Sequence, residues 1–237
     1  MRGLLISSLL LLCACQVKSS QVLRVCAAPD SLPVSDRTEH GFENRIAKVL
    51  AEELGAKVSY TWGVGPNCDV VIGSRGSNGE FATTHPYYRS SYVFLTRADR
   101  SLYFRSLDDA RLRPLKLGVE TEAAGSFRTA LATRGVDDVS TFSTAASLIA
   151  AVEKKALDVA ILWGPRAGSC AHGDASALRI SVINPGEGDA FLSGDVCVGV
   201  REDKGELREA LDRALVRRRS DIDSILREFG VPLTASE

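Results

Sequence analysis

The sequence predicts an α/β protein built as two lobes, and three observations support this. The chain has 237 residues, 45% of them hydrophobic and 25% charged, which is enough for one large or two small folded domains. Short apolar runs alternate with segments of helical periodicity, as in sheets flanked by helices. The stretch 68–97 leaves a buried run at Val70–Ile72, passes three glycines and enters a second run at Tyr92–Leu95. Such a stretch predicts a crossover between two lobes.

Residues 1–14 have the pattern of a signal peptide of the lipoprotein type. The apolar run Leu4–Leu12 follows Arg2 and is too short to span a membrane as a stable helix. The sequence Leu-Cys-Ala-Cys that ends at Cys15 resembles a bacterial lipobox, which predicts lipidation of Cys15. Ordinary cleavage nearby, with a soluble product, is the alternative. With lipidation at Cys15, residues 15–21 would form a tether. In either case the protein would be exported to a compartment where disulfides can form.

The first part of the mature chain predicts a strand, a helix and two further strands. Val22–Ala27 is the first strand and Lys57–Trp62 the second. Gly41–Leu54 is a helix between them, because five of its apolar residues share one face: Phe42, Ile46, Val49, Leu50 and Leu54. Only Gly63–Asn67 link the second strand to the third. That is shorter than the dozen or more residues that a crossover between parallel strands usually needs.

The second part of the chain alternates strands with helices, which predicts a second parallel sheet. Strands are expected at Leu115–Val119, Val139–Phe142, Asp158–Trp163, Leu178–Ile183 and Asp195–Arg201. Helices are expected over Glu122–Arg134, after the capping residue Thr144, around Leu207–Leu215 and from the capping residue Ser220 to Phe229.

Composition and motifs exclude several classes of function. Net charge is −1 without a concentrated basic face, so no nucleic-acid partner is expected. The chain has no serine-centred elbow, no HExxH and no phosphate-binding loop. We therefore expect no catalytic residue, no metal ligand and no cofactor, and we expect that the protein is not an enzyme.

The order of elements, with a return strand and two terminal helices at the end, resembles the type II periplasmic solute-binding proteins. Within that group, several segments resemble the J-type proteins encoded beside quinoprotein methanol dehydrogenases (MxaJ/XoxJ type). These segments are Arg24–Ala27, Gly41–Ala47, Cys68–Gly73, Thr83-Thr84 with Pro86–Ser90, and Trp163–Pro165 with Ala167-Gly168. The resemblance runs from Val22 to Leu233.

The resemblance implies a two-lobed type II fold. Each lobe would be a mostly parallel sheet flanked by helices, and two crossover strands would join the lobes. Residues 22–96 would form the first part of lobe 1, residues 97–195 lobe 2, and residues 196–237 the return strand and helices that complete lobe 1. The family carries a helix between its second and third strands, where this chain has only Gly63–Asn67.

The resemblance also places a ligand or partner cleft between the lobes. An amino-acid receptor needs an arginine for the carboxylate and an acid for the ammonium group. In importer relatives the arginine lies a few residues before the Pro-Tyr-Tyr motif, where this chain has Gly79–Ala82 and no cation. The acid lies five residues after the aspartate that corresponds to Asp158, where this chain has Trp163. We therefore expect no capture of standard amino acids. The residues expected at the cleft are Tyr87, Tyr88, Arg89, Trp163 and Arg166, with Arg89 pairing with an acid across the hinge.

Besides the lipidation candidate Cys15, four cysteines lie beyond the signal segment. Cys26 and Cys68 lie on strands that are neighbours in the implied fold, at a spacing compatible with a disulfide. Cys170 with Cys197 is a second candidate pair. Zinc binding is the competing idea, but no paired Cys/His spacing supports it.

The function that the resemblance implies is that of an accessory protein. It would assist or mature a periplasmic PQQ-dependent alcohol (methanol) dehydrogenase, with a subunit of that quinoprotein as its partner. It would reside in the periplasm, held to the membrane through its N-terminal lipid. The alternative is the receptor of an ABC-type importer, with a small-molecule ligand that is not a standard amino acid.

Overall fold

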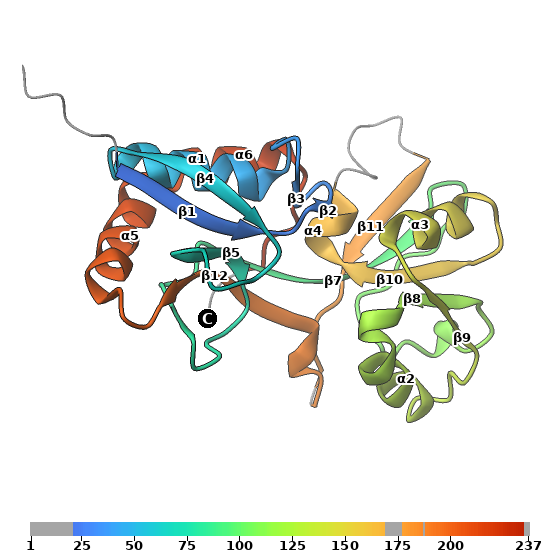
Figure 1. Cartoon of the computed structure of the whole chain (residues 1–237). Coiled ribbons are helices and arrows are strands. Elements are labelled where there is room, and N and C mark those ends of the chain that lie inside the picture. Colours follow the sequence, from blue (N-terminus) through green and yellow to red (C-terminus); the bar gives the residue numbers. More distant parts are fainter. Residues whose placement is uncertain (1–20, 169–176, 187, 235–237) are drawn as a thin grey trace, which may run out of the picture.

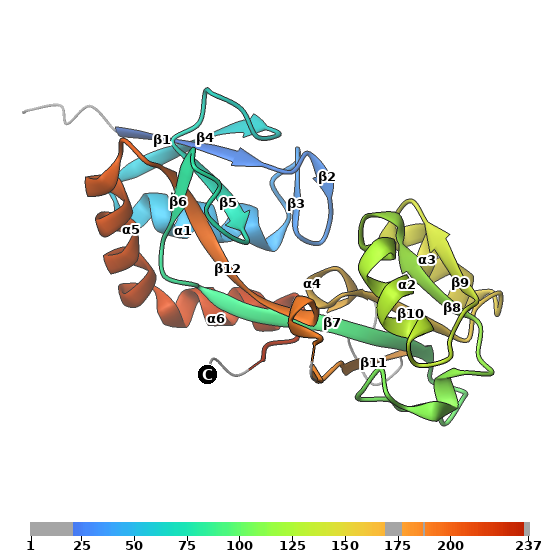
Figure 2. The ribbon, with the colours of Figure 1, turned by 90° about the horizontal axis from the view of Figure 1, so that it is seen from below.

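The computed structural model describes residues 21–168, 177–186 and 188–234, and it shows two lobes side by side (Figure 1). Two long strands run between the lobes, β7 (Tyr88–Arg97) and β12 (Ser193–Arg201), as Figure 2 shows from below. The strands pair antiparallel with each other where they cross, with Ser91 opposite Ser193 and Tyr88 opposite Val196. One sheet therefore continues through both lobes, in the order β4-β1-β5-β12-β7-β10-β8-β9. The predicted signal segment and Cys15 lie outside the described residues.

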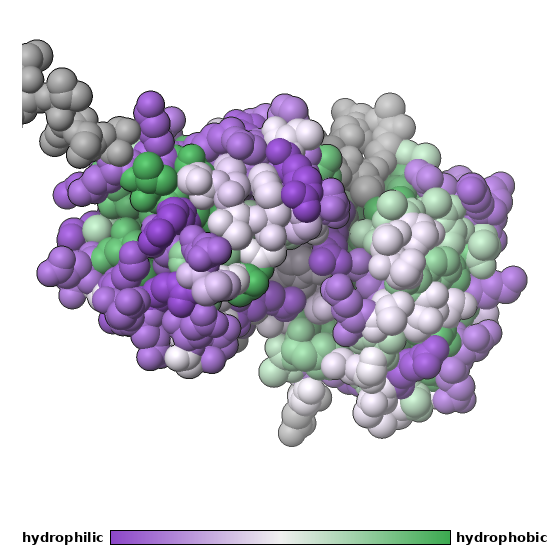
Figure 3. Space-filling model, in the orientation of Figure 1, coloured by the Kyte–Doolittle hydropathy of each residue, from purple (hydrophilic) through white to green (hydrophobic). Residues whose placement is uncertain are grey.

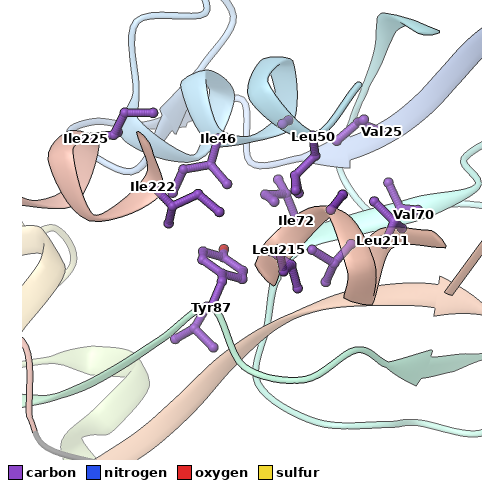
Figure 4. Packing of buried hydrophobic residues seen from close by; sticks show 14 of the residues in the cluster. Val25, Ile46, Leu50, Val70, Ile72, Tyr87, Leu211, Leu215, Ile222 and Ile225 are labelled. Carbon is purple, nitrogen blue, oxygen red and sulfur yellow. The ribbon is translucent and has the colours of Figure 1, made fainter. Parts of the chain in front are cut away.

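Lobe 1 consists of the first elements of the chain together with its last two helices. Its strands are β1 (Gln21–Ala27), β4 (Ala56–Trp62), β5 (Val70–Ser74) and β6 (Phe81–Thr83), with a small hairpin of β2 (Asp30–Ser31) and β3 (Ser35–Asp36). Its helices are α1 (Phe42–Glu53), α5 (Gly205–Arg217) and α6 (Arg219–Glu228). Helix α1 packs against both α5 and α6. Their apolar faces and the strands form one hydrophobic core (Figure 4).

The short link between β4 and β5 is possible because the two strands are staggered. Both run parallel to β1, on its two sides. Strand β4 ends at Trp62 opposite Ala27, while β5 begins at Val70 opposite Val25. The start of β5 therefore lies only two residues back along β1 from the end of β4. A link without a helix is long enough to cover that distance.

The helices cover one face of the lobe 1 sheet, and a disulfide lies on the other. Val25 and Val70 point into the helix-covered core, while Cys26 and its bonded partner Cys68 form a separate small cluster with Phe81. Successive side chains of a strand point to opposite faces, which explains the division. The predicted disulfide is therefore present, and it fastens the short link to β1.

Lobe 2 has a core on both faces of its sheet. Its strands are β8 (Leu117–Glu120), β9 (Val139–Phe142), β10 (Val159–Trp163) and β11 (Leu178–Val182), and its α-helices are α2 (Ala124–Ala132), α3 (Ala145–Glu153) and α4 (Gly164–Ala167). Short 3₁₀ turns occupy Ala110–Leu112, Thr121–Ala123 and Ala190–Leu192. Phe94 and Ile161 face the α2 side, whereas Leu95 and Leu162 face the α3 side.

The sequence reasoning located most of these elements but not every detail. The predicted parallel pairing is present in both lobes: β1 pairs parallel with β4 and β5, and β8 with β9 and β10. The strand β11, however, pairs antiparallel with β7. The crossing strands pair antiparallel with their neighbours β5 and β10, so the sheet is mixed in both lobes. The short strands β2, β3 and β6 and the one-turn helix α4 were missed, since such elements carry almost no periodicity. No helix in the described ranges is long and apolar enough to cross a membrane.

Candidate functional site

A cavity of about 230 Å³ lies between the lobes. Lobe 1 contributes the segment that follows β1, the first turn of α1 and the carboxyl end of β5. Lobe 2 contributes the carboxyl ends of β8 and β10 with the turns after them. The space-filling view shows the hollow between the two halves of the molecule (Figure 3). The side chains that line it and carry charge or aromatic rings are Glu43, Arg75, Tyr88, Tyr92, Glu120, Glu122, Trp163 and Arg166.

Glu43 is a buried carboxyl group at the lobe 1 wall of this cavity. It lies in the first turn of α1 and is 5% exposed. The Tyr87 hydroxyl donates a hydrogen bond to its Oε1 at 3.3 Å, and the Tyr88 hydroxyl also interacts with it. Burial raises the pKa of Glu43 to about 7, although the tyrosine hydroxyls act in the opposite direction. The group can therefore carry or release a proton near neutral pH.

Gly73 makes room for the Glu43 carboxyl group. It has a φ of +77°, and a Cβ atom built on it would lie 2.5 Å from both carboxyl oxygens. A larger residue at 73 would therefore displace Glu43 and strain the backbone as well. This close approach explains the glycine at the point where β5 turns toward the cleft.

The lobe 2 wall is an aromatic platform. The Trp163 ring meets the Tyr92 ring edge-on at 5.3 Å, and these residues are register partners on β10 and β7. Tyr92 in turn meets Phe127 of α2 at 4.8 Å, and Phe127 meets Phe191 at 5.2 Å. The chain of edge-to-face contacts leads from the cavity into the lobe 2 core, so the Trp163 ring is held in place from behind.

Two arginines line the cavity, one from each lobe. Arg75 follows β5, and its Cζ lies 4.0 Å from the centroid of the Trp163 ring, so this contact joins the lobes. Arg166 of α4 is paired within lobe 2, with Nη1 at 2.6 Å from Glu120 Oε1 and Nη2 at 3.8 Å from Glu122 Oε2. The charge of Arg166 is therefore balanced by its own lobe, whereas that of Arg75 reaches across the cavity.

The structure brings together three of the five cleft residues named from the sequence. Tyr88, Trp163 and Arg166 line the cavity. Tyr87 does not: it is 1% exposed, and Figure 4 shows its ring among the core residues of lobe 1. Its place as a cleft residue is corrected: its ring packs in the lobe 1 core beside that of Tyr88, and its hydroxyl is bonded to Glu43 instead of lining the cavity. Arg89 does not line the cavity either, so its place as a cleft residue is also corrected. It pairs with Asp195 at 3.0 Å where β7 and β12 cross, which confirms its predicted contact at the hinge.

The second candidate cysteine pair is corrected. Cys197 lies on β12 as a free, buried thiol. Burial raises its pKa to about 11, and the neighbouring Asp195 and Asp212 act in the same direction. Cys170 lies outside the described residues.

Sequence reasoning missed Glu43 and Arg75 as residues of the cavity. A signal existed for Arg75, because it follows a buried strand at its carboxyl end, and such ends meet at one edge of an α/β sheet. Glu43 gave a weaker signal. A carboxyl group in the first turn of a helix is ordinarily interpreted as a solvated partner of the helix dipole.

A pair of lobes joined by two strands of one sheet, with a cavity between them, defines the class of two-lobed binding proteins. No family model matches the chain. The chain is 32% identical over 245 residues to the protein MoxJ of Methylorubrum extorquens, covering 89% of this chain and 81% of the relative. It is 33% identical to the crystal structure of the periplasmic binding protein XoxJ from Methylobacterium extorquens AM1, with a TM-score of 0.74 over 90% of this chain and 100% of that one.

A further crystal structure, that of MxaJ from Methlophaga aminisulfidivorans MPT, has the same fold. It superposes with a TM-score of 0.78 at 23% identity, over 90% of this chain and 100% of that chain. The chain belongs to the MoxJ family, within the class of two-lobed, type II periplasmic binding proteins.

Proposed function

We propose that this protein is an exported accessory protein that assists or matures a periplasmic PQQ-dependent alcohol (methanol) dehydrogenase, held to the membrane by a lipid on Cys15. Its MoxJ family membership is the observation that carries this proposal. The J-type proteins that the sequence resembles are encoded beside such dehydrogenases. The lipobox-like sequence that ends at Cys15 supports export and anchoring.

The chemistry of the cleft also supports a role other than import of amino acids. A free zwitterion needs an unpaired cation for its carboxylate and an unpaired acid for its ammonium group. Arg166 is already paired with Glu120, and Arg75 lies over the Trp163 ring. Glu43 is buried against tyrosine hydroxyls with a pKa of about 7. The aromatic platform of Trp163 and Tyr92 is better suited to hold a flat group or a segment of a partner protein.

A receptor for a small solute is the second candidate. The cavity of about 230 Å³ between the lobes favours it, because binding proteins of this architecture enclose their ligands at that position. A neutral or singly charged solute would fit better than an amino acid does, because Arg166 of the cavity is already paired with Glu120 and Glu122.

Purification of the tagged, full-length chain from its own periplasm tests the proposal. Native mass spectrometry is expected to show a co-purifying quinoprotein dehydrogenase subunit. A Trp163→Ala variant is expected to recover less of it, while Tyr103→Ala, which removes an exposed ring of lobe 2 outside the cavity, serves as the matched control. Recovery of a bound small solute and no dehydrogenase subunit would replace the proposal with the second candidate.

The lipid anchor has its own test. Metabolic labelling with a palmitate analogue is expected to label the wild-type protein and not a Cys15→Ser variant. An unlabelled wild-type protein would remove the anchor from the proposal and leave the rest standing.

A further inference from the structure

The contact between Arg75 and Trp163 has the geometry of a ligand in a binding site. The guanidinium carbon lies 4.0 Å from the ring centroid, well within the range at which a cation is attracted to an aromatic face. Both residues line the same cavity, and they come from different lobes. An arginine that only solubilised a surface would not need to cross the cleft to a fixed tryptophan ring.

The Trp163 ring offers a rigid face to a cation. It is backed by the edge-to-face contact with Tyr92, which is itself backed by the buried Phe127. On the side of lobe 1, Trp163 packs against the hydrophobic core of that lobe, and Arg75 lies over the ring. A flat, weakly hydrated guanidinium group is the cation best suited to stacking on such a ring.

The charges that surround the cavity favour a cation at this position. Glu43, Glu120 and Glu122 line it, against Arg75 and Arg166. Within the described residues no carboxylate lies within ion-pair distance of the Arg75 guanidinium, whereas Arg166 is paired with both Glu120 and Glu122. Without Arg75, the cavity would hold three carboxyl groups and one guanidinium group that is already paired.

We propose that the cleft contains a subsite for a guanidinium or alkylammonium group on the face of Trp163, and that Arg75 of the same chain fills this subsite in the present structure. The protein therefore carries its own cleft ligand. Because Arg75 belongs to lobe 1 and Trp163 to lobe 2, occupation of the subsite from within the chain also links the lobes. The proposal does not depend on the dehydrogenase partner.

The subsite can be tested by removing its internal occupant and adding a free one. Ethylguanidinium is the probe, and saturation-transfer NMR of its ethyl protons is the measurement, which suits the millimolar affinity expected for so small a molecule. The Arg75→Ala variant is expected to give a saturable signal, and wild type at least about tenfold less at the same probe concentration. Ethylurea, which is similar in shape but uncharged, is expected to give no saturable signal.

Two further variants separate this subsite from other surfaces. Arg37→Ala removes the arginine that lies over the chain's other tryptophan, Trp62, at 5.9 Å, and it should behave as wild type does. The double variant Arg75→Ala/Trp163→Leu should lose the signal. Arg75 is exposed, so its replacement should leave the fold intact, and Arg75→Gln provides a second variant of similar length.

Three results would overturn the proposal. One is the lack of a saturable signal in both Arg75 variants. Another is equal binding of ethylurea, which would show an apolar hole rather than a cation site. The third is a signal that persists in the double variant or is as strong in wild type as in Arg75→Ala, since either would place the probe elsewhere.

Discussion

The two lobes stabilise their sheets in different ways. In lobe 2, side chains from both faces of the sheet pack into hydrophobic clusters, under α2 on one side and α3 on the other. In lobe 1, all three helices pack on one face. The opposite face carries the small cluster of Cys26, Cys68 and Phe81 and a network of charged side chains.

The difference follows from the short link between β4 and β5. A link of residues 63–69 brings no helix to cover the outer face of the sheet, so β4 exposes Lys57 and Ser59 there. Covalent and polar contacts take the place of the missing core. Arg201 donates hydrogen bonds to the Cys68 carbonyl at 2.8 Å and to the Gly65 carbonyl at 3.1 Å, and Asp69 binds Arg24 and Lys204, each at 2.7 Å.

The largest effect is expected from removing a core ring of lobe 2. Phe127 is fully buried between Tyr92 and Phe191, so Phe127→Ala should lower the free energy of unfolding by roughly 4 kcal/mol through the lost transfer energy and the cavity left behind. Denaturant unfolding measures the loss. Hydrogen exchange should rise in β8 and β10 and stay unchanged in β1 and β4. An equal rise of hydrogen exchange in both lobes would mean that the lobes unfold as one unit, which would contradict their separate stabilisation.

Removing the disulfide should affect lobe 1 in the same selective way. The bond joins residues 42 positions apart, so the Cys26→Ala/Cys68→Ala variant should lose roughly 2–4 kcal/mol, because its unfolded chain regains conformational freedom. Exchange should rise in β1, β4 and β5. Cys197→Ala, which removes the free thiol, is the control for loss of a buried sulfur. A variant as stable as wild type would show that the polar network alone holds the link.

Glu43 should make lobe 1 sensitive to pH. Its folded-state pKa of about 7 lies above the ordinary value of 4.5, so the folded protein keeps a proton that the unfolded chain releases. Stability should be full below pH 4.5 and fall as pH rises to about 7, by at most about 3 kcal/mol. Glu43→Gln should abolish this fall and exceed wild type in stability at pH 8.

Thermal unfolding across this pH range measures the effect of Glu43. Glu202→Gln, at an exposed position, should retain the wild-type pH dependence. The same slope in Glu43→Gln as in wild type would assign the pH dependence to other groups and would leave Glu43 an ordinary carboxylate.

Much of the cleft was not accessible to sequence reasoning. Trp163, Tyr88 and Arg166 were found because a family pattern places their segments beside the cleft. Tyr87 was assigned to the cleft with Tyr88, yet the extended backbone turns it into the lobe 1 core. Both tyrosines are buried in that core, and nothing local in the sequence shows that only Tyr88 also lines the cavity, so the tertiary packing alone decides it.

The sequence by itself determined the alternation of strands and helices, the stripe of α1, the cap Thr144 and the residues able to form the disulfide, because these depend on local periodicity and on chemistry that each residue carries. The predicted cap Ser220 was wrong, since α6 already begins at Arg219 with Arg218 as its N-cap. The tertiary structure alone decided how a short link joins β4 to β5, since that depends on the stagger of strands beside β1. It also decided that Arg75 meets Trp163 and that Glu43 lies against Gly73. Such contacts join residues distant in sequence, and their energies depend on burial and spacing that exist only once the chain has folded.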